Sequence, residues 1–443
     1  MPNQAAPINA MPTKAFFVTM LVRDISPERA ILDLVDNCID GAKRTRPDGQ
    51  YQGLHVSIVL NNTALEISDN CGGFDTTTAR DYAFRFGRPA AADQTDFSIG
   101  QFGVGMKRAL FKFARKFSVS SKTAHESWSM SVDVAEWANE ETPWQFDFLD
   151  VLVGQDNSIA DCGTKIICSP LTKEIEQRFG DPLFQQRLAQ ILRSHQRQFL
   201  SQGLTISLNG TFLTNTNIAI LSGGSYTPAV EEFTLEEETD APLSVRIVAG
   251  IGNSNPSEAG WYIICNGRVI LSADRSEATG WGSVAEQADG IPKFHNQYAR
   301  FRGVVLFTCK DSRKLPWNTA KTGLDQSNAG WQLAYTKMLD HARSVMNYLN
   351  ALDNDIEEWG RASSPMLASV THETVTREAE TFTKKSAFAV NRNPRAPGPK
   401  MLKIQYSREE TKVRQLMTAL GAASGKAVGE GTFDIVFKEQ IGD

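Results

Sequence analysis

Apolar positions in the first 170 residues repeat in two ways, at helical spacing and in alternation. Residues 26–44 carry apolar side chains at helical spacing after a Ser-Pro start, which predicts an amphipathic helix. Residues 54–70 alternate apolar and polar positions around an Asn-Asn pair, which predicts a β-hairpin. Further strands are predicted at 128–134 and 163–169. Together, the predicted helices and strands of these 170 residues are typical of helices packed on one face of a mixed sheet.

The pattern continues beyond residue 170 with a long helical stretch at 171–200. Apolar stretches then predict further β-structure, at residues 204–213, 243–252, 260–271 and 301–309. The stretch 260–271 is interpreted as a core strand pair with Asn266 and Gly267 in its turn. A helical pattern at 331–349 closes a second α/β domain.

These patterns divide the chain into four parts: a first domain of residues 1–170, a second of 171–352, a linker region of 353–400 and a small appendage of 401–443. Residues 391–400 are rich in proline and basic side chains, which is typical of a flexible linker. In the appendage, residues 408–420 predict a helix and residues 431–437 predict a strand.

The composition is that of an ordinary globular chain, and it bears on whether nucleic acid or a membrane is a partner. Of the 443 residues, 41% are apolar and 22% charged, and the net charge of −5 gives no general attraction to nucleic acid. The longest apolar runs are far too short to span a bilayer, so we expect no membrane partner. The six cysteines lack CxxC pairing, which is typical of reduced thiols in a cytoplasmic protein.

Three groups of residues in the first domain are candidates for chemistry. Asp33, Asn37 and Asp40 lie at i, i+4 and i+7, so they share one side of the predicted helix. Asp69 ends the hairpin just before a glycine turn. A loop with three glycines in residues 100–105 precedes another amphipathic helix. Taken alone, each is typical of ordinary structure: a solvated helix face, a common turn and a packing loop.

The order of these groups changes the interpretation. The stretches "DLVDNCIDGA", "SDNCGG", "IGQFGVGMK" and "GTKI" occur in the order and approximate spacing of the four motifs of the GHKL (Bergerat-fold) ATPases. This superfamily holds type II topoisomerases, MutL, MORC proteins, the large heat-shock chaperone and histidine kinases. The resemblance implies an α+β fold: a Bergerat-type α/β sandwich followed by an S5-like transducer domain. It also implies ATP and Mg²⁺ as cofactors.

The resemblance assigns roles to residues around the base and the metal. Asn37 would be the Mg²⁺ ligand, a neutral oxygen donor that adds no charge beside the phosphates. Asp33 stands where the family usually has the glutamate that deprotonates the attacking water; because aspartate is one methylene shorter, we expect slow hydrolysis. Asp69 would select adenine, with Thr164 supporting it through a shared water. The family's DxGxG continues to Gly73 but has Cys71 at its first glycine, so Cys71 must accept glycine-like angles or the turn must differ.

The glycine loop resembles the family's phosphate-covering lid. Its backbone amides and the following helix N-terminus would contact phosphates, through Gly100, Gln101, Phe102, Gly103, Val104, Gly105 and Met106. Lys107 would add a cation. We expect the remaining basic side chains of this helix to face elsewhere, as solvated charges or as a surface for nucleic acid or a partner: Arg108, Lys112, Arg115 and Lys116.

In relatives with a transducer domain, one lysine of that domain reaches the γ-phosphate. Lys321 in "WNTAKTG" is the candidate here, with Lys314 as the alternative.

For the biological role, the leading hypothesis is a MORC-like ATPase of the kind found in prokaryotic antiviral defence. ATP would close a homodimeric clamp, with residues 1–20 docked across the twofold axis, on DNA or on an operon-encoded partner. Two alternatives stay open. One is a chaperone-like ATPase that remodels a protein client, and the other is a non-hydrolysing nucleotide-gated scaffold.

Overall fold

The computed structural model describes residues 12–20, 22–87, 95–100, 103–282, 291–390 and 404–442. The chain divides into two compact units. Residues 1–353 and 369–392 form the larger unit, and residues 354–368 and 393–443 form the smaller one. Across the described residues, none of the helices is both long enough and apolar enough to span a bilayer.

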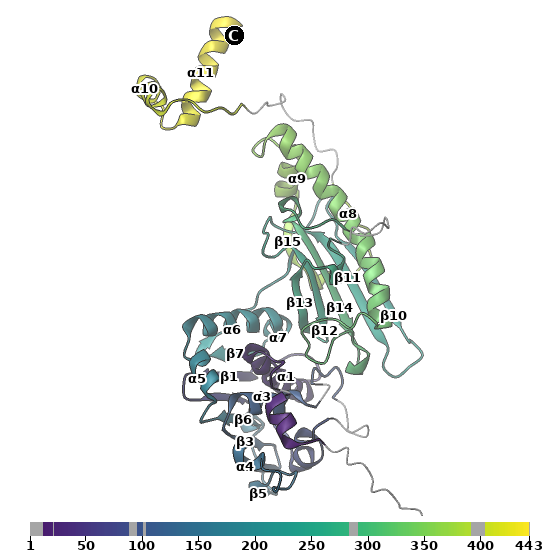
Figure 1. Cartoon of the computed structure of the whole chain (residues 1–443). Coiled ribbons are helices and arrows are strands. Elements are labelled where there is room, and N and C mark those ends of the chain that lie inside the picture. Colours follow the sequence, from purple (N-terminus) through teal and green to yellow (C-terminus); the bar gives the residue numbers. More distant parts are fainter. Residues whose placement is uncertain are drawn as a thin grey trace, which may run out of the picture. The chain divides into compact units, whose positions relative to one another are not determined.

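The larger unit begins with an eight-stranded mixed sheet in the order β5-β4-β3-β6-β2-β1-β7-β8 (Figure 1). Its strands are β1 (His55–Leu60), β2 (Leu65–Asp69), β3 (Lys116–Lys122), β4 (Glu126–Asp133), β5 (Phe148–Val153), β6 (Gly163–Cys168), β7 (Thr205–Leu208) and β8 (Thr211–Phe212). Neighbours pair antiparallel except β1 and β7, which run parallel. The sheet and its helices confirm the predicted α+β class, and β1–β2 is the predicted hairpin.

Helices accompany this sheet, and the first carries much of the site. They are α1 (Pro27–Thr45), α2 (Thr76–Thr78), α3 (Gly105–Phe113), α4 (Val134–Trp137), α5 (Lys173–Phe179), α6 (Pro182–His195) and α7 (Arg197–Ser201). Helix α1 begins as predicted, because the Ser26 side chain accepts a hydrogen bond from the amide of Arg29 and Pro27 takes the first position. It buries apolar side chains such as Ile31 and Leu34 against the rest of the domain and packs against α3.

Two predictions in this region were wrong. The helical stretch 171–200 is three helices, because Asp181 caps a new start at Pro182 and the helix breaks again at Gln196. Strand β7, which we had placed in the second domain, pairs with β1 of the first sheet. Helices α5 and α6 provide the crossover that a parallel strand needs. The first sheet therefore extends past residue 170.

A second sheet, with the order β10-β11-β14-β12-β13, follows in the same unit. Its strands are β10 (Ala229–Leu235), β11 (Leu243–Ile251), β12 (Gly260–Cys265), β13 (Arg268–Asp274) and β14 (Phe301–Thr308), while β9 (Ala219–Ser222) pairs with β15 (Val375–Glu378). Asn266 and Gly267 form the predicted turn of the β12–β13 hairpin, and both have positive φ. Helix α8 (Ala329–Trp359) packs on this sheet, with the Trp331 ring against Phe307.

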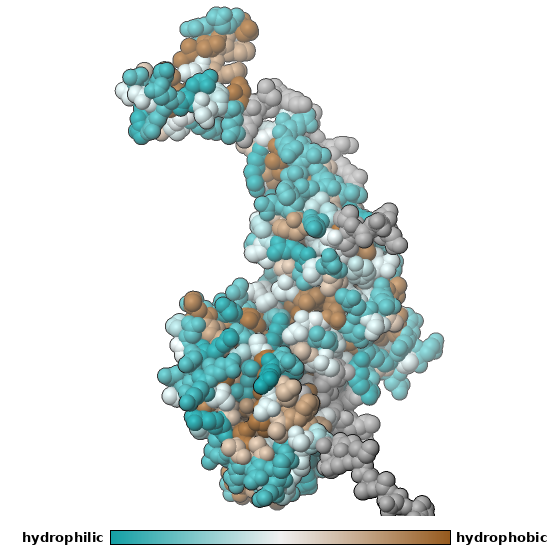
Figure 2. Space-filling view, viewed as in Figure 1, coloured by the Kyte–Doolittle hydropathy of each residue, from teal (hydrophilic) through white to brown (hydrophobic). Residues whose placement is uncertain are grey.

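The C-terminal part differs from the prediction. It contains α10 (Glu410–Leu420) and α11 (Gly425–Gln440), so the strand predicted at 431–437 is wrong. Ser424 caps α11, and Phe433 and Phe437, one helical turn apart, stack their rings. The apolar residues of this stretch fit both a strand and a helix, and the structure has a helix. Figure 2 shows apolar surface on this helical pair, where Phe433, Val436 and Phe437 are exposed. Helix α9 (Pro365–Glu373) completes the elements, and the predicted linker at 391–400 lies outside the described residues.

Candidate functional site

One cavity of the larger unit gathers the predicted site residues. Its walls come from α1, the end of β2, the N-terminus of α3, the start of β6 and the loop before α8. The predicted residues that line it are Asp33, Asn37, Asp69, Gly73, Gly100, Gly103, Val104, Gly105, Met106, Lys107, Thr164 and Lys321. Gln101 and Phe102 lie outside the described residues. Residues far apart in sequence thus share one site.

Helix α1 presents its polar stripe to this cavity. Asn37 is exposed there, although its neighbours in the helix are buried. Asp40 is buried and accepts hydrogen bonds from the backbone amides of Ile99 and Gly100, each at 2.7 Å. A Cβ at Gly100 would lie 2.9 Å from an Asp40 oxygen and 3.1 Å from the Asn37 amide oxygen. The stripe is therefore no solvated face, because Asp40 fixes the start of the glycine loop against α1.

Asp69 also lines the cavity and accepts hydrogen bonds from backbone amides. Its Oδ1 accepts from the amide of Cys71 at 2.8 Å and from the amide of Thr164 at 3.4 Å. Burial raises the pKa of Asp69, against these hydrogen bonds. At Gly163, a Cβ would lie 1.8 Å from the Asp69 carbonyl oxygen, so only glycine lets the two segments approach this closely.

The turn after Asp69 resolves the question that Cys71 raised. The left-handed backbone angles fall on Gly72 (φ 94°) and Gly73 (φ 64°), and not on Cys71. Cys71 is almost fully buried, and burial raises the pKa of its thiol well above the usual value. It is a packed thiol in a turn that does not need glycine at this position.

The N-terminus of α3 lies at the cavity. Val104 and Gly105 begin this helix without a side-chain cap, and both line the cavity. Gly103, just before them, has a left-handed φ of 65°. At Gly105, a Cβ would lie 3.0 Å from an Asp33 carboxylate oxygen. An uncapped helix start at a concave surface favours a negatively charged ligand.

Lys107, in the first turn of α3, is buried beneath the cavity. Its Nζ donates to the carbonyl oxygen of Ala83 at 2.7 Å and lies over the ring of Phe86. Burial lowers the pKa of Lys107 to about 7. Near neutral pH the side chain therefore exchanges between the ammonium and the neutral amine.

Asp33 is engaged by two cations. Arg108 Nη2 lies 3.0 Å from its Oδ2, and Lys321 Nζ lies 3.7 Å from its Oδ1. The expectation that Arg108 faces away from the site was wrong, because the close approach of α3 to α1 at Gly105 brings its guanidinium to Asp33. Lys112 and Arg115 do bond elsewhere, to the carbonyl oxygens of Val22 and Leu171. Lys116 is exposed.

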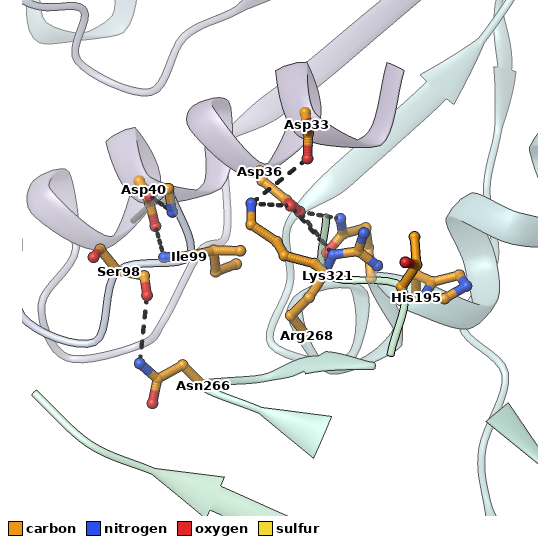
Figure 3. A network of polar contacts seen from close by, with 12 residues as sticks. Asp33, Asp36, Asp40, Ser98, Ile99, His195, Asn266, Arg268 and Lys321 are labelled. Atoms are coloured by element: carbon orange, nitrogen blue, oxygen red, sulfur yellow. Dashed lines mark hydrogen bonds and ion pairs between the residues drawn. The ribbon is translucent and has the colours of Figure 1, made fainter. Parts of the chain in front are cut away.

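Lys321, in the loop before α8, lines the cavity and belongs to a buried ion cluster (Figure 3). Its Nζ donates to Asp36 Oδ2 at 2.9 Å, and its own backbone is left-handed, with φ 50°. The alternative, Lys314, is instead paired with Glu236. Burial lowers the pKa of Lys321, but the carboxylates of Asp36 and Asp33 outweigh it and raise the pKa above the usual value.

Sequence reasoning missed Asp36 and its other partners. Asp36 is fully buried and also contacts Arg268, whose Nε lies 3.0 Å from Oδ1, and Gln196, whose Nε2 donates at 2.8 Å. Burial opposes ionisation of Asp36, but Arg268 and Lys321 prevail and lower its pKa to about 2. The sequence did contain two signals for this pair. Asp36 lies on the apolar side of α1 and Arg268 lies in an apolar strand, and a buried charge needs a partner.

The donor set fits a magnesium nucleotide. The Asn37 amide oxygen is a hard neutral ligand, suited to a cation that keeps most of its own water. The uncapped start of α3 and the Lys321 ammonium suit phosphate oxygens, and the buried Asp69 carboxylate suits an amino group. At Gly100 and Gly105, a side chain would collide with the carboxylates of Asp40 and Asp33 respectively, so both positions favour glycine.

The comparisons agree with this reading of the first domain. Residues 25–150 match the family model described as histidine kinase-, DNA gyrase B-, and HSP90-like ATPase. Residues 25–150 are therefore similar to GHKL-type ATPase domains. The match includes Asn37, Asp69 and the glycine loop, whereas Thr164 and Lys321 lie beyond it. The comparison with curated proteins gives no match.

Replacing Lys107 by Met should change how stability depends on pH. In the folded chain the pKa of Lys107 is about 7, against 10.5 in the unfolded chain, so the unfolded chain binds more protons between these values. Wild-type stability should therefore rise with pH across that window, by about 1–3 kcal/mol between pH 7.5 and 9.5 relative to the variant. Urea unfolding at both pH values measures this. If the two proteins differ in free energy of unfolding by the same amount at both pH values, the pKa of Lys107 is not lowered in the folded chain.

Proposed function

We propose that the chain is a slow, magnesium-dependent ATPase whose second domain closes on the nucleotide through Lys321. In this proposal it acts as a MORC-like, homodimeric clamp. The observation that carries the proposal is that Lys321 lines the same cavity as Asn37, Asp69 and the N-terminus of α3. A ligand that touches all four must join the first domain to the second.

Each end of the nucleotide has residues suited to it. The Asp69 carboxylate, oriented by the amides of Cys71 and Thr164, would accept the adenine amino proton. The Asn37 oxygen would hold Mg²⁺, which when bound neutralises charge on the phosphates. The residues from Gly100 to Gly105 and the α3 amides would cover the phosphates, with Lys107 beneath them. Lys321 would meet the terminal phosphate.

Asp33 is the candidate general base for the attacking water. It lies one helical turn before Asn37 and lines the cavity. Two features predict a slow reaction. The aspartate side chain is short for this task, and Arg108 at 3.0 Å competes with water for Oδ2. The same ion pair favours a second candidate function, a scaffold that binds ATP and does not hydrolyse it.

The position of Lys321 supports the proposed clamp. ATP can shift an open-to-closed equilibrium only through contacts that form in the closed state, and a contact from the second domain to the terminal phosphate is one of these. We propose that closure docks the N-terminal segment across a twofold axis; residues 1–11 of that segment lie outside the described residues. The clamp would act on DNA or on an operon-encoded partner, in prokaryotic antiviral defence.

Asn37→Ala tests the metal ligand. The variant should lose most of its affinity for ATP in the presence of Mg²⁺, at least about tenfold, because the metal loses an oxygen ligand. Asn62→Ala, in the exposed turn of the β1–β2 hairpin, is the matched control and should bind as wild type does. Calorimetric titration with a non-hydrolysable ATP analogue measures both. Unchanged affinity in Asn37→Ala would exclude the assigned ligand.

Asp33→Ala separates the enzyme from the scaffold. If Asp33 is the base, steady-state turnover should fall by about 10²-fold or more, the usual contribution of a general base. Nucleotide affinity, measured in parallel, should change far less. Equal turnover in wild type and variant would remove Asp33 as the base and favour the scaffold.

Nucleotide-dependent dimerisation tests the clamp. We expect the full chain to elute as a monomer without nucleotide and as a dimer with Mg²⁺ and a non-hydrolysable ATP analogue, measured by light scattering. Lys321→Met should remain monomeric in both conditions, because it cannot contact the terminal phosphate. An oligomeric state that ignores the nucleotide would argue against a clamp.

A further inference from the structure

The turn of the β12–β13 hairpin contacts the nucleotide site at two points. Asn266 Nδ2 lies 3.4 Å from the carbonyl oxygen of Ser98, just before the glycine loop, and its backbone oxygen accepts from Lys43. Two residues later, the Arg268 side chain is buried and reaches Asp36 beneath the cavity. Figure 3 shows both contacts. The sequence had suggested only a plain turn between core strands.

We propose that Arg268 is a positioning residue for Lys321 and acts through Asp36. Arg268 shares the charge of this buried carboxylate, and so leaves the Lys321 ammonium available to the terminal phosphate. The inference rests on the proposed function, in which Lys321 meets that phosphate. It adds a residue of the second domain that touches neither the nucleotide nor the cavity wall.

The geometry around Asp36 shows how the charge is shared. Arg268 Nε lies 3.0 Å from Oδ1 and 3.3 Å from Oδ2, and Gln196 donates to Oδ1. Lys321 is left with Oδ2 alone, at 2.9 Å, while it also faces Asp33. Without Arg268, Lys321 would be the remaining ion-pair partner, among the described residues, of a carboxylate with no exposure to water. A charge buried in this way binds its remaining counterion strongly, so Lys321 would be drawn away from the phosphate.

Stability alone does not account for this cluster. Buried ion pairs are often no better for stability than well-packed apolar side chains, because taking both charges out of water is costly. What a buried cluster does provide is one fixed arrangement of its members. Here the arrangement joins α1, which carries Asp33 and Asn37, to the turn that contacts the start of the glycine loop.

The test compares two affinities that differ only by the terminal phosphate. Calorimetric titrations with Mg²⁺ give the affinity for a non-hydrolysable ATP analogue and for ADP. Wild type should prefer the triphosphate about tenfold, the value of one charge-assisted contact. Arg268→Met should lose this preference to within about twofold, as Lys321→Met should, and the double variant should lose no more than either alone.

Arg302→Met is the matched control. Arg302 is a buried arginine of the same sheet, in β14, and it pairs with Glu258 away from the cavity. The variant should lose as much thermal stability as Arg268→Met and still prefer the triphosphate. If Arg268→Met does not fold, Arg268→Gln, which removes the cation but keeps a polar side chain, replaces it in the comparison with the same expected loss of preference.

A second substitution that restores the preference for the triphosphate distinguishes a positioning role of Arg268 from a purely structural one. Adding Asp36→Asn to Arg268→Met removes the carboxylate that captures Lys321, so the preference should return. A preference retained in Arg268→Met, or not restored by Asp36→Asn, would overturn the inference. If Lys321→Met itself keeps the preference, the fault lies with the proposed contact of Lys321 to the phosphate and hence with the proposed function.

Discussion

The structure depends on how one buried carboxylate is neutralised. Asp36 has no exposure to water, and an uncompensated charge there would be very unfavourable. Its two ion-pair partners are Arg268, in the β12–β13 hairpin, and Lys321, in the loop before α8. The helix that carries Asn37 and Asp33 is therefore tied electrostatically to these two segments, close to where the proposed phosphates would lie. Lys321 thus both neutralises Asp36 and lines the proposed nucleotide site.

Helix α1 shows how a short segment serves several purposes at once. Asp33 and Asn37 face the cavity, Asp36 faces the second domain, and Asp40 holds the amides of Ile99 and Gly100. Four polar residues within eight positions would be costly in a helix otherwise buried on all sides. Here each described carboxylate has a donor: Arg108, Lys321 or backbone amides. The cost is offset locally, which leaves Asn37 open to a ligand.

Much of the first domain could be predicted because its signals are local. The start of α1 at Ser26, the β1–β2 hairpin and the glycine loop before α3 all follow from neighbouring residues. Contacts between distant segments could not be predicted in this way. Asp36 and Arg268 are 232 positions apart, and nothing near either residue names the other. Two other predictions failed for a related reason. The spacing of apolar residues did not show that β7 pairs with β1, nor that residues 431–437 belong to a helix and not to a strand.

The central claim is that the second domain completes the nucleotide site through Lys321. The most direct measurement is a crystal structure of the full chain with Mg²⁺ and a non-hydrolysable ATP analogue. The account predicts adenine at Asp69, Mg²⁺ on Asn37 and the terminal phosphate in contact with Lys321 while Arg268 stays on Asp36. A nucleotide bound with Lys321 remote from its phosphates, or bound outside this cavity, would contradict the account.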